Sequence, residues 1–261
     1  MSTALQRIVC LSAEAADWLW RLGAWERVAG VTSYFAQPTD APPKPCVSGF
    51  SSANLDHIAR LNPDLVITFS DVQAGIAGAL VNRGVPVLAT NQRSLAEIEV
   101  TLALLARVVS CEAAGERLLH EFREKLTSVA AEIRPRVYFE EWNDPLITGI
   151  AWVSELIERA GGEDVFAALR EKPAAPDRTL TPEKILHADP EIIFASWCGK
   201  PFRSDEIAAR PGWERLPAVR EHRIYEIPGA DILQPGFRLV YGYDQIKRHL
   251  QPLTCGAALS H

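Results

Sequence analysis

Short hydrophobic runs alternate with longer amphipathic stretches along the first 109 residues. The runs predict β-strands at Arg7–Ser12, Val28–Ser33, Leu65–Phe69 and Val85–Thr90. Hydrophobic residues at helical spacing predict helices between them, at about residues 14–26, 54–61, 72–83 and 94–109. Continuous apolar strands that alternate with helices are typical of a parallel sheet that helices cover on both faces.

The pattern changes between Ser110 and Ile133, where no proline interrupts one long amphipathic stretch. Its apolar residues form a single helical stripe: Leu118, Leu119, Phe122, Leu126, Val129, Ala130 and Ile133. We therefore expect one helix of roughly 36 Å, at 1.5 Å per residue. Pro135 should end it, because the residue before a proline avoids the helical conformation.

Strands and helices alternate again after this helix. We expect strands at Val137–Glu141, Ile192–Trp197 and Ile224–Ile227, and helices at about 151–160, 182–187, 204–209 and 236–250. The sequence thus predicts an α/β protein of two Rossmann-like lobes with mostly parallel sheets, joined by one long helix. The predicted parts are residues 1–109, 110–134 and 135–261.

The two predicted lobes share a repeated segment. LDHIARLNPDLVITF at 55–69 aligns with PEKILHADPEIIFAS at 182–196, and the alignment places Asp56 on Glu183. Both acids fall in the first turn of a predicted helix, where the helix dipole favours negative charge. Gene duplication and convergence on one helix–strand pattern both explain the repeat, and the shared isoleucine, proline and acidic positions favour duplication.

Composition restricts the classes of function. The chain has 261 residues, of which 48% are hydrophobic and 23% are charged, and this composition is typical of a globular protein. Its net charge of −6 argues against the basic surface that a nucleic-acid-binding protein needs. No apolar run is long enough to span a membrane. The N-terminus as written shows no secretory signal, so the chain as written is expected in the cytoplasm. Five widely spaced cysteines do not form a disulfide or zinc pattern.

Aromatic residues gather where the predicted strands end. Ligands of open α/β sheets bind beyond the carboxyl ends of the strands. The candidate ligand-binding residues there are Ser12, Tyr34, Phe35, Phe69, Trp142, Trp197 and Cys198, together with Phe50 in the loop just before the repeated segment. Flat rings with a polar tip suit a large, partly apolar ligand. The alternative is that these rings cap the hydrophobic cores, and that Cys198 is an inert buried thiol rather than a soft ligand.

No catalytic or resident metal site is predicted. The sequence lacks a dinucleotide-binding GxGxxG after a strand, a phosphate-binding loop and a GxSxG motif, and its histidines are scattered. Glu140 and Glu141 are adjacent in a predicted strand, so their side chains should point to opposite faces and not share a proton.

The lobe–helix–lobe order and the repeated segment resemble the substrate-binding proteins of cobalamin and ferric-siderophore ABC importers. The resemblance is greatest to the cobalamin-binding members and runs from Arg7 to about Leu250. It rests on RIVCLSAEAADWLWRLGAWERVAGVTSY at 7–34, NLDHIARLNPDLVI at 54–67, ELIERAGGEDVF at 155–166 and ILQPGFRLVYGYDQI at 232–246.

The resemblance implies that the chain is a binding protein, not an enzyme. It implies cobalamin or a related corrinoid as a ligand between the lobes, no covalent cofactor, and a dimeric ABC permease that contacts Asp56 and Glu183. It further implies a monomer that works in the periplasm if the start is trimmed or misassigned. A ferric siderophore or haem is an alternative ligand, for which Arg178, Lys200 and Arg203 are the candidate cations; a cytoplasmic protein that handles tetrapyrroles or metals is another alternative.

Overall fold

The computed structural model describes residues 5–254, which fold into two compact units. Unit 1 runs to Gln92 and also includes Ala96–Arg123 and Gln234–Arg238. Unit 2 consists of Arg93–Leu95, Glu124–Leu233 and the chain from Leu239 onward. The units therefore interleave along the chain, whereas the sequence predicts three consecutive parts.

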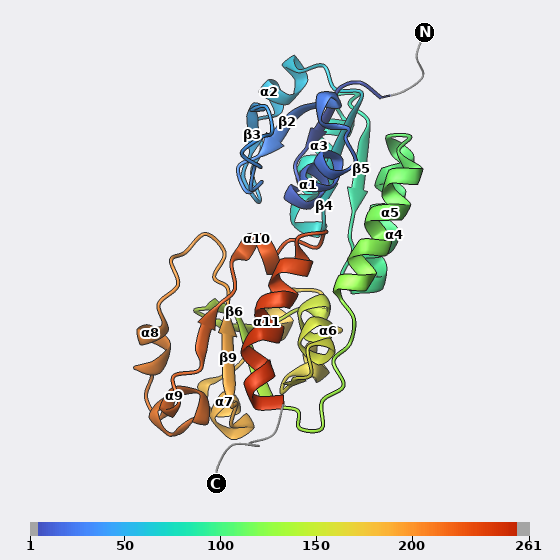
Figure 1. Cartoon of the computed structure of the whole chain (residues 1–261). Helices are drawn as coiled ribbons and strands as arrows, with labels where there is room; N and C mark the ends of the chain where they lie inside the picture. The colour runs from blue at the N-terminus through green and yellow to red at the C-terminus, as the bar shows by residue number, and fades with distance from the viewer. Residues whose placement is uncertain (1–4, 255–261) are drawn as a thin grey trace. The chain divides into compact units, whose positions relative to one another are not determined.

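Unit 1 contains a five-stranded sheet whose strand pairs are all parallel (Figure 1). The strands lie in the order β3-β2-β1-β4-β5. Their bounds are Ile8–Cys10 for β1, Val28–Thr32 for β2, Cys46–Ser48 for β3, Leu65–Phe69 for β4 and Val87–Thr90 for β5. The predicted strands are present at all four places, and β3 is a fifth strand that its short sequence did not reveal.

Helices cover both faces of this sheet. They are α1 (Ala13–Arg21), α2 (Leu55–Arg60), α3 (Ala74–Val81), α4 (Leu95–Val108) and α5 (Glu112–Lys125), together with short 3₁₀ turns at Trp25–Arg27 and Asp71–Gln73. On one face, Val9 and Val66 of the sheet pack with Ile58 of α2 and Leu80 of α3. Asn54 begins α2 as an N-cap, since its side chain accepts a hydrogen bond from the amide of His57 at 2.9 Å.

A short segment from late in the chain completes the core of unit 1. The ring of Phe237 lies 6.1 Å from that of Trp18 in α1 and 6.0 Å from that of Phe122 in α5. Phe237 is 2% exposed, and the guanidinium of Arg21 lies over its ring at 4.3 Å. Gln234–Arg238 is thus an integral part of unit 1.

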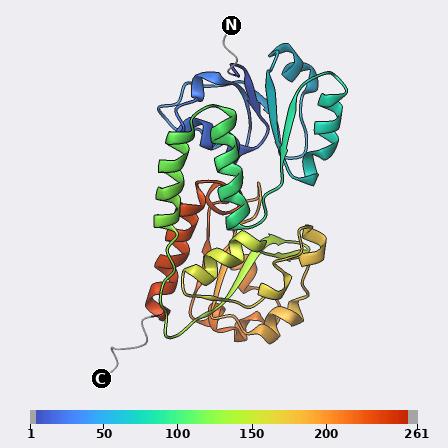
Figure 2. The same cartoon turned by 90° about the vertical axis from the view of Figure 1, so that its right-hand side faces the viewer.

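The predicted helix at 110–133 is too long. Figure 2 shows α4 and α5 side by side, and α5 ends at Lys125. Beyond it, the Val129 amide donates to the Arg159 carbonyl at 2.7 Å, and Arg159 donates to the Leu126 carbonyl at 3.1 Å. Thr127 and Ser128 are weak helix formers, so these tertiary hydrogen bonds outcompete the helical pattern.

Unit 2 contains a second five-stranded sheet, in which strands follow the order β10-β9-β6-β7 and β8 also pairs with β6 (Figure 1). Only the β6–β7 pair is antiparallel. The bounds are Arg136–Asn143 for β6, Leu146–Thr148 for β7, Glu163–Asp164 for β8, Ile192–Ala195 for β9 and Ile224–Glu226 for β10. The hairpin strand β7 and the short β8 were not predicted.

The helices of unit 2 are α6 (Ala151–Arg159), α7 (Pro182–Ala188), α8 (Ser204–Ala208), α9 (Pro217–Arg220), α10 (Gly229–Ile232) and α11 (Leu239–Thr254). Short 3₁₀ turns occupy Ala167–Leu169, Ala175–Arg178 and Trp213–Arg215. Tyr138 and Ile193 of the sheet share a core with Ile185 of α7 and Trp213. Among residues 5–254, no helix is both long and apolar enough to cross a membrane.

Candidate functional site

The carboxyl ends of the unit 1 strands form the first part of the candidate site. The chain passes from β1 outward through β2 to β3 and then returns to β4 on the other side of β1. The strand order therefore reverses between β1 and β4, which is where open parallel sheets bind ligands. The residues that follow these two strands begin with Leu11-Ser12 and Ser70-Asp71.

Tyr34 and Phe50 form an exposed aromatic pair at neighbouring strand ends. Tyr34 follows β2, Phe50 follows β3, and their ring centroids lie 6.0 Å apart with planes at 65°. Tyr34 is 40% exposed and Phe50 is 47% exposed, so both rings remain accessible in unit 1. The side chain of Gln234 donates to the Tyr34 carbonyl at 3.0 Å, which restrains the backbone beside the ring.

The other three candidates of unit 1 are buried. Phe35 packs against Trp25 with centroids 5.4 Å apart, and Phe69 is the last residue of β4. Each is 9% exposed, while Ser12 is 4% exposed and stands at the N-cap position of α1 without a capping side-chain bond. These three side chains have less accessible surface than Tyr34 and Phe50, and their part in ligand binding stays a prediction.

Gln73 joins three of these strand ends, and no sequence pattern singled it out. Its side-chain amide donates to the carbonyls of Leu11 at 3.1 Å and Phe50 at 2.9 Å, and its oxygen accepts from the Phe69 amide at 3.0 Å. Gln73 is buried, so these bonds satisfy a side chain that burial would otherwise penalise. The loops after β1, β3 and β4 are thereby held together.

Glu14 is a buried acid in the first turn of α1. It is 5% exposed, and its Oε1 has no hydrogen-bond partner among residues 5–254. Burial raises the pKa of this carboxyl to about 7, because the charged form loses its hydration. Gly236 lies directly against it, where an added Cβ would stand 2.6 Å from the Glu14 Cβ.

In unit 2, Trp197 follows β9 and belongs to a buried polar cluster with Tyr138 and Glu140 of β6. The Glu140 carboxylate accepts hydrogen bonds from the Trp197 indole at 3.0 Å, from the Tyr138 hydroxyl at 3.2 Å and from Arg210 at 2.5 and 2.8 Å. Trp197 is 5% exposed. Its ring is therefore oriented by Glu140, and its accessible surface in unit 2 is small.

Glu141 does not share the hydrogen-bond partners of Glu140. A register shift between Glu140 and Trp142 places Glu141 at an irregularity of the β6–β7 pair, and its carboxylate accepts from Arg178 at 2.8 Å. Burial raises the Glu141 pKa, and Arg178 opposes that rise. Cys198 is exposed, and the pKa of its thiol is raised by partial burial and by the charge of Glu141.

Trp142 is half-buried and packs against the edge of the unit 2 core. Its indole donates to the Asp144 carbonyl at 2.7 Å, which fixes the ring beside the turn that follows β6. No group of three or more histidine, cysteine, aspartate or glutamate residues able to hold a metal ion occurs in the described part of the chain. The arrangement at the strand ends thus offers rings and hydrogen-bonding groups.

Comparison with known proteins assigns these two α/β units to a family. A family model described as periplasmic binding protein matches residues 8–230. The chain belongs to this family. Members of the periplasmic binding protein family are substrate-binding proteins, which agrees with the resemblance seen in the sequence.

Relatives of this chain are named for more than one ligand. A vitamin B12-binding protein from Vibrio parahaemolyticus is 25% identical over 95% of this chain and 90% of its own length. An uncharacterized ABC transporter substrate-binding lipoprotein from Bacillus subtilis is 24% identical over 95% of this chain and 81% of its own length. The solved structure of a periplasmic heme-binding protein from Roseiflexus shares the fold, with a TM-score of 0.81 at 22% identity over 95% of this chain and 99% of that one.

The two repeated acids differ in their surroundings. Asp56 on α2 pairs with Arg83 at 2.6 Å, and the Arg83 hydrogen bond lowers the Asp56 pKa. Glu183 on α7 has a lowered pKa because its own backbone amide and the Thr181 hydroxyl donate to it. Thr181 is the N-cap residue of α7, although its side chain does not bond a backbone amide there. Both acids lie on the surface.

Proposed function

We propose that this protein is the substrate-binding component of an ABC importer, with cobalamin or a related corrinoid as its ligand. The observation that supports the ligand is the similarity to a vitamin B12-binding protein, which extends over 95% of the chain. The similarity to an ABC transporter substrate-binding lipoprotein, also over 95% of the chain, supports the importer.

The chemistry of the strand ends is consistent with a corrinoid. A corrin ring is large and flat, with apolar edges and uncharged amide side chains. Tyr34 and Phe50 offer it exposed ring surface and a phenol hydroxyl in unit 1, and Trp142 offers a half-buried indole in unit 2. Stacking and apolar contact with such rings stabilise a ligand of this kind without requiring a charged partner.

The candidate cations favour an uncharged ligand over an anionic ferric chelate. Arg178 is 2% exposed and donates to the Glu141 carboxylate and to three backbone carbonyls. Arg203 pairs with Asp205 at 2.7 Å. Lys200 lies 5.1 Å from the Trp197 ring centroid, and both Lys200 and Arg203 are exposed. Arg178 is therefore committed within the protein, and Arg203 would have to give up its ion pair to bind an anionic siderophore or a haem propionate.

We further propose that the protein acts outside the cytoplasm and that Asp56 and Glu183 contact an ABC permease dimer. Their equivalent places in the repeat, on α2 of unit 1 and α7 of unit 2, support one contact from each unit. Asp56 would exchange its surface pair with Arg83 for a cation of the permease. That exchange costs little, since exposed ion pairs contribute roughly 0–1 kcal/mol.

Titration calorimetry with cyanocobalamin tests the ligand, with ferrichrome and hemin as parallel ligands. We expect one-to-one binding of cyanocobalamin and no comparable heat from the other two. Tighter binding of hemin or ferrichrome would identify that compound as the ligand in place of a corrinoid, and the protein would still be assigned to an importer. Absence of binding by all three would contradict the proposed ligand class.

A further inference from the structure

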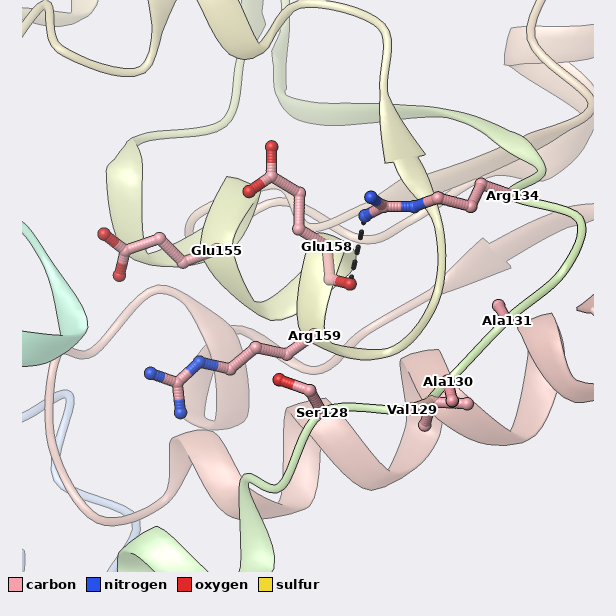
Figure 3. Close-up of a pocket in the computed structure, with 8 residues that line it drawn as sticks. All are labelled: Ser128, Val129, Ala130, Ala131, Arg134, Glu155, Glu158 and Arg159. Atoms are coloured by element: carbon pink, nitrogen blue, oxygen red, sulfur yellow. Dashed lines mark hydrogen bonds between the residues drawn. The ribbon is translucent and has the colours of Figure 1, made fainter.

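Unit 2 has a hollow remote from the carboxyl ends of its strands, beside the C-terminal turn of α6. Figure 3 shows its lining, which consists of Ser128, Val129, Ala130, Ala131, Arg134, Glu155, Glu158 and Arg159. Its volume is about 520 Å³, which falls in the range of small-molecule sites. The hollow exists because the chain leaves the helical path after Lys125 and runs extended past α6.

The hollow lies at the end of unit 2 opposite the candidate ligand site. Glu163, at the start of β8, donates its amide to the Pro135 carbonyl immediately before β6, so α6 ends beside the amino ends of these strands. Gly161 follows α6 with φ of +90°, and a Cβ there would lie 3.1 Å from Ala131. This close approach holds the extended segment against the end of the helix.

The guanidinium groups of the two arginines of the hollow are held by backbone carbonyls, and the charge of Glu155 offsets part of the Arg159 charge. Arg134 donates to the carbonyls of Glu158 and Gly162, and Arg159 donates to the carbonyl of Leu126. Neither forms an ion pair with a carboxylate among residues 5–254. Backbone carbonyls orient a guanidinium without neutralising it, and each group keeps further N–H donors.

The two acids of the hollow are directed to other partners. Both carboxylate oxygens of Glu158 lie 3.0 Å from Arg170 Nη1. The Glu155 carboxylate accepts the Leu95 amide at 2.7 Å. Figure 3 shows the Glu158 carboxylate turned away from Ser128 and Arg159, while the Ser128 hydroxyl is directed toward the Arg159 side chain. The side of the hollow formed by Ser128 and Arg159 therefore presents hydrogen-bond donors.

We propose that this hollow is a second binding site, which takes a small molecule bearing a carboxylate or phosphate group. Arg159 and Ser128 bind the oxyanion, Arg134 adds positive charge at the other end of the hollow, and the body of the molecule lies along Val129–Ala131. Charge-assisted hydrogen bonds from guanidinium groups are the usual means of binding such oxyanions. This site does not depend on the ligand assigned to the strand ends.

The test uses inorganic phosphate and succinate as probes, titrated into the full chain by calorimetry. The informative pair of variants is Ala130→Glu and Ala130→Gln, because Ala130 is exposed and its side chain makes no hydrogen bond. The glutamate places a negative charge in the hollow, whereas the glutamine adds the same bulk without charge. We expect at least one probe to bind, and Ala130→Glu to weaken it about tenfold relative to Ala130→Gln.

Arg159→Gln should weaken binding by a similar factor, and Arg123→Gln serves as its control. Arg123 pairs with Glu99 and lies outside the hollow, so its replacement should leave the affinity unchanged. Melting curves establish that each variant is folded. The relative affinities for phosphate and succinate identify the preferred oxyanion. Absence of binding by both probes, or equal binding by Ala130→Glu and Ala130→Gln, overturns the proposal.

Discussion

Arg210 forms a bidentate ion pair with the fully buried carboxylate of Glu140. Arg210 donates to both oxygens, at 2.5 and 2.8 Å, and Glu140 has 0% exposure. Replacing Arg210 by alanine leaves the carboxylate without its counter-charge. We expect this change to lower the free energy of unfolding by about 3–5 kcal/mol, as measured by urea denaturation.

Arg203→Ala is the matched control for this prediction. Arg203 forms a comparable pair with Asp205, but both side chains are more than half exposed. Its loss should change stability by less than about 1 kcal/mol. Joint replacement of Glu140 by leucine and Arg210 by methionine should restore much of the lost stability; equal losses from Arg210→Ala and Arg203→Ala would contradict the role given to burial.

Glu14 should make stability fall as the pH rises. Its pKa is about 7 in the folded protein and 4.5 in an unfolded chain, so the folded state binds the extra proton between these values. Stability from the protonated acid is therefore complete below about pH 4.5 and is lost as the pH approaches 7, by roughly 3 kcal/mol in total.

Glu14→Gln removes this titration while keeping a neutral side chain of similar shape. Melting temperatures of the variant and the unchanged protein should diverge between pH 5 and pH 8, with the variant the more stable at pH 8. Glu155→Gln provides a comparison at a less buried acid, where burial also raises the pKa but the carboxylate accepts the Leu95 amide. Parallel melting curves for Glu14→Gln and the unchanged protein would show that Glu14 titrates normally.

The exposed and buried aromatic candidates should respond differently to alanine. Tyr34→Ala and Phe50→Ala remove accessible rings, so we expect about tenfold weaker cyanocobalamin binding with little change in stability. Phe35→Ala opens a cavity against Trp25 and should lower the free energy of unfolding by about 3–5 kcal/mol. Calorimetry and urea denaturation separate the two effects, and a loss of stability without a loss of affinity at Tyr34 and Phe50 would assign both rings to the core.

Asp56→Ala with Glu183→Ala should leave ligand affinity unchanged and slow transport by the reconstituted importer. Arg83→Ala, which frees the Asp56 carboxylate, should maintain or increase transport, because a permease cation then meets no internal competitor. The matched control is Asp205→Ala, an exposed acid of unit 2 on α8. Unchanged transport by the double variant would remove both acids from the proposed interface.

The spacing of hydrophobic residues in the sequence predicted helices with one buried face and strands with both faces buried. Leu65–Phe69 is β4 with the predicted bounds, because its β-branched residues Val66–Thr68 favour a strand. The helix ending at Lys125 shows the limit of this reasoning. Its apolar stripe continues to Ile133, yet hydrogen bonds to Arg159, far along the chain, decide the conformation of the segment after Lys125.

The sequence predicted which residues lie near the strand ends, but not which of their side chains are exposed. The strand pattern identified Tyr34 as a strand-end residue, whereas Phe50 was placed in the loop before the repeated segment because β3 was not predicted; both rings are exposed. The sequence could not distinguish them from Trp197, whose burial depends on Glu140 and on the 198–213 segment packing over it. The hydrogen bonds of Gln73 could not be predicted from the sequence either, since they depend on three loops that only the folded sheet brings together.

The place of Phe237 in unit 1 has a consequence for synthesis of the chain. Its ring fills the space between Trp18 and Phe122, although more than a hundred residues of unit 2 separate it from α5 in the sequence. A nascent chain that has emerged only through α5 lacks this ring and the rest of Gln234–Arg238. The N-terminal unit therefore cannot complete its core on the ribosome until nearly the entire protein has been translated, and no contiguous N-terminal fragment reproduces it.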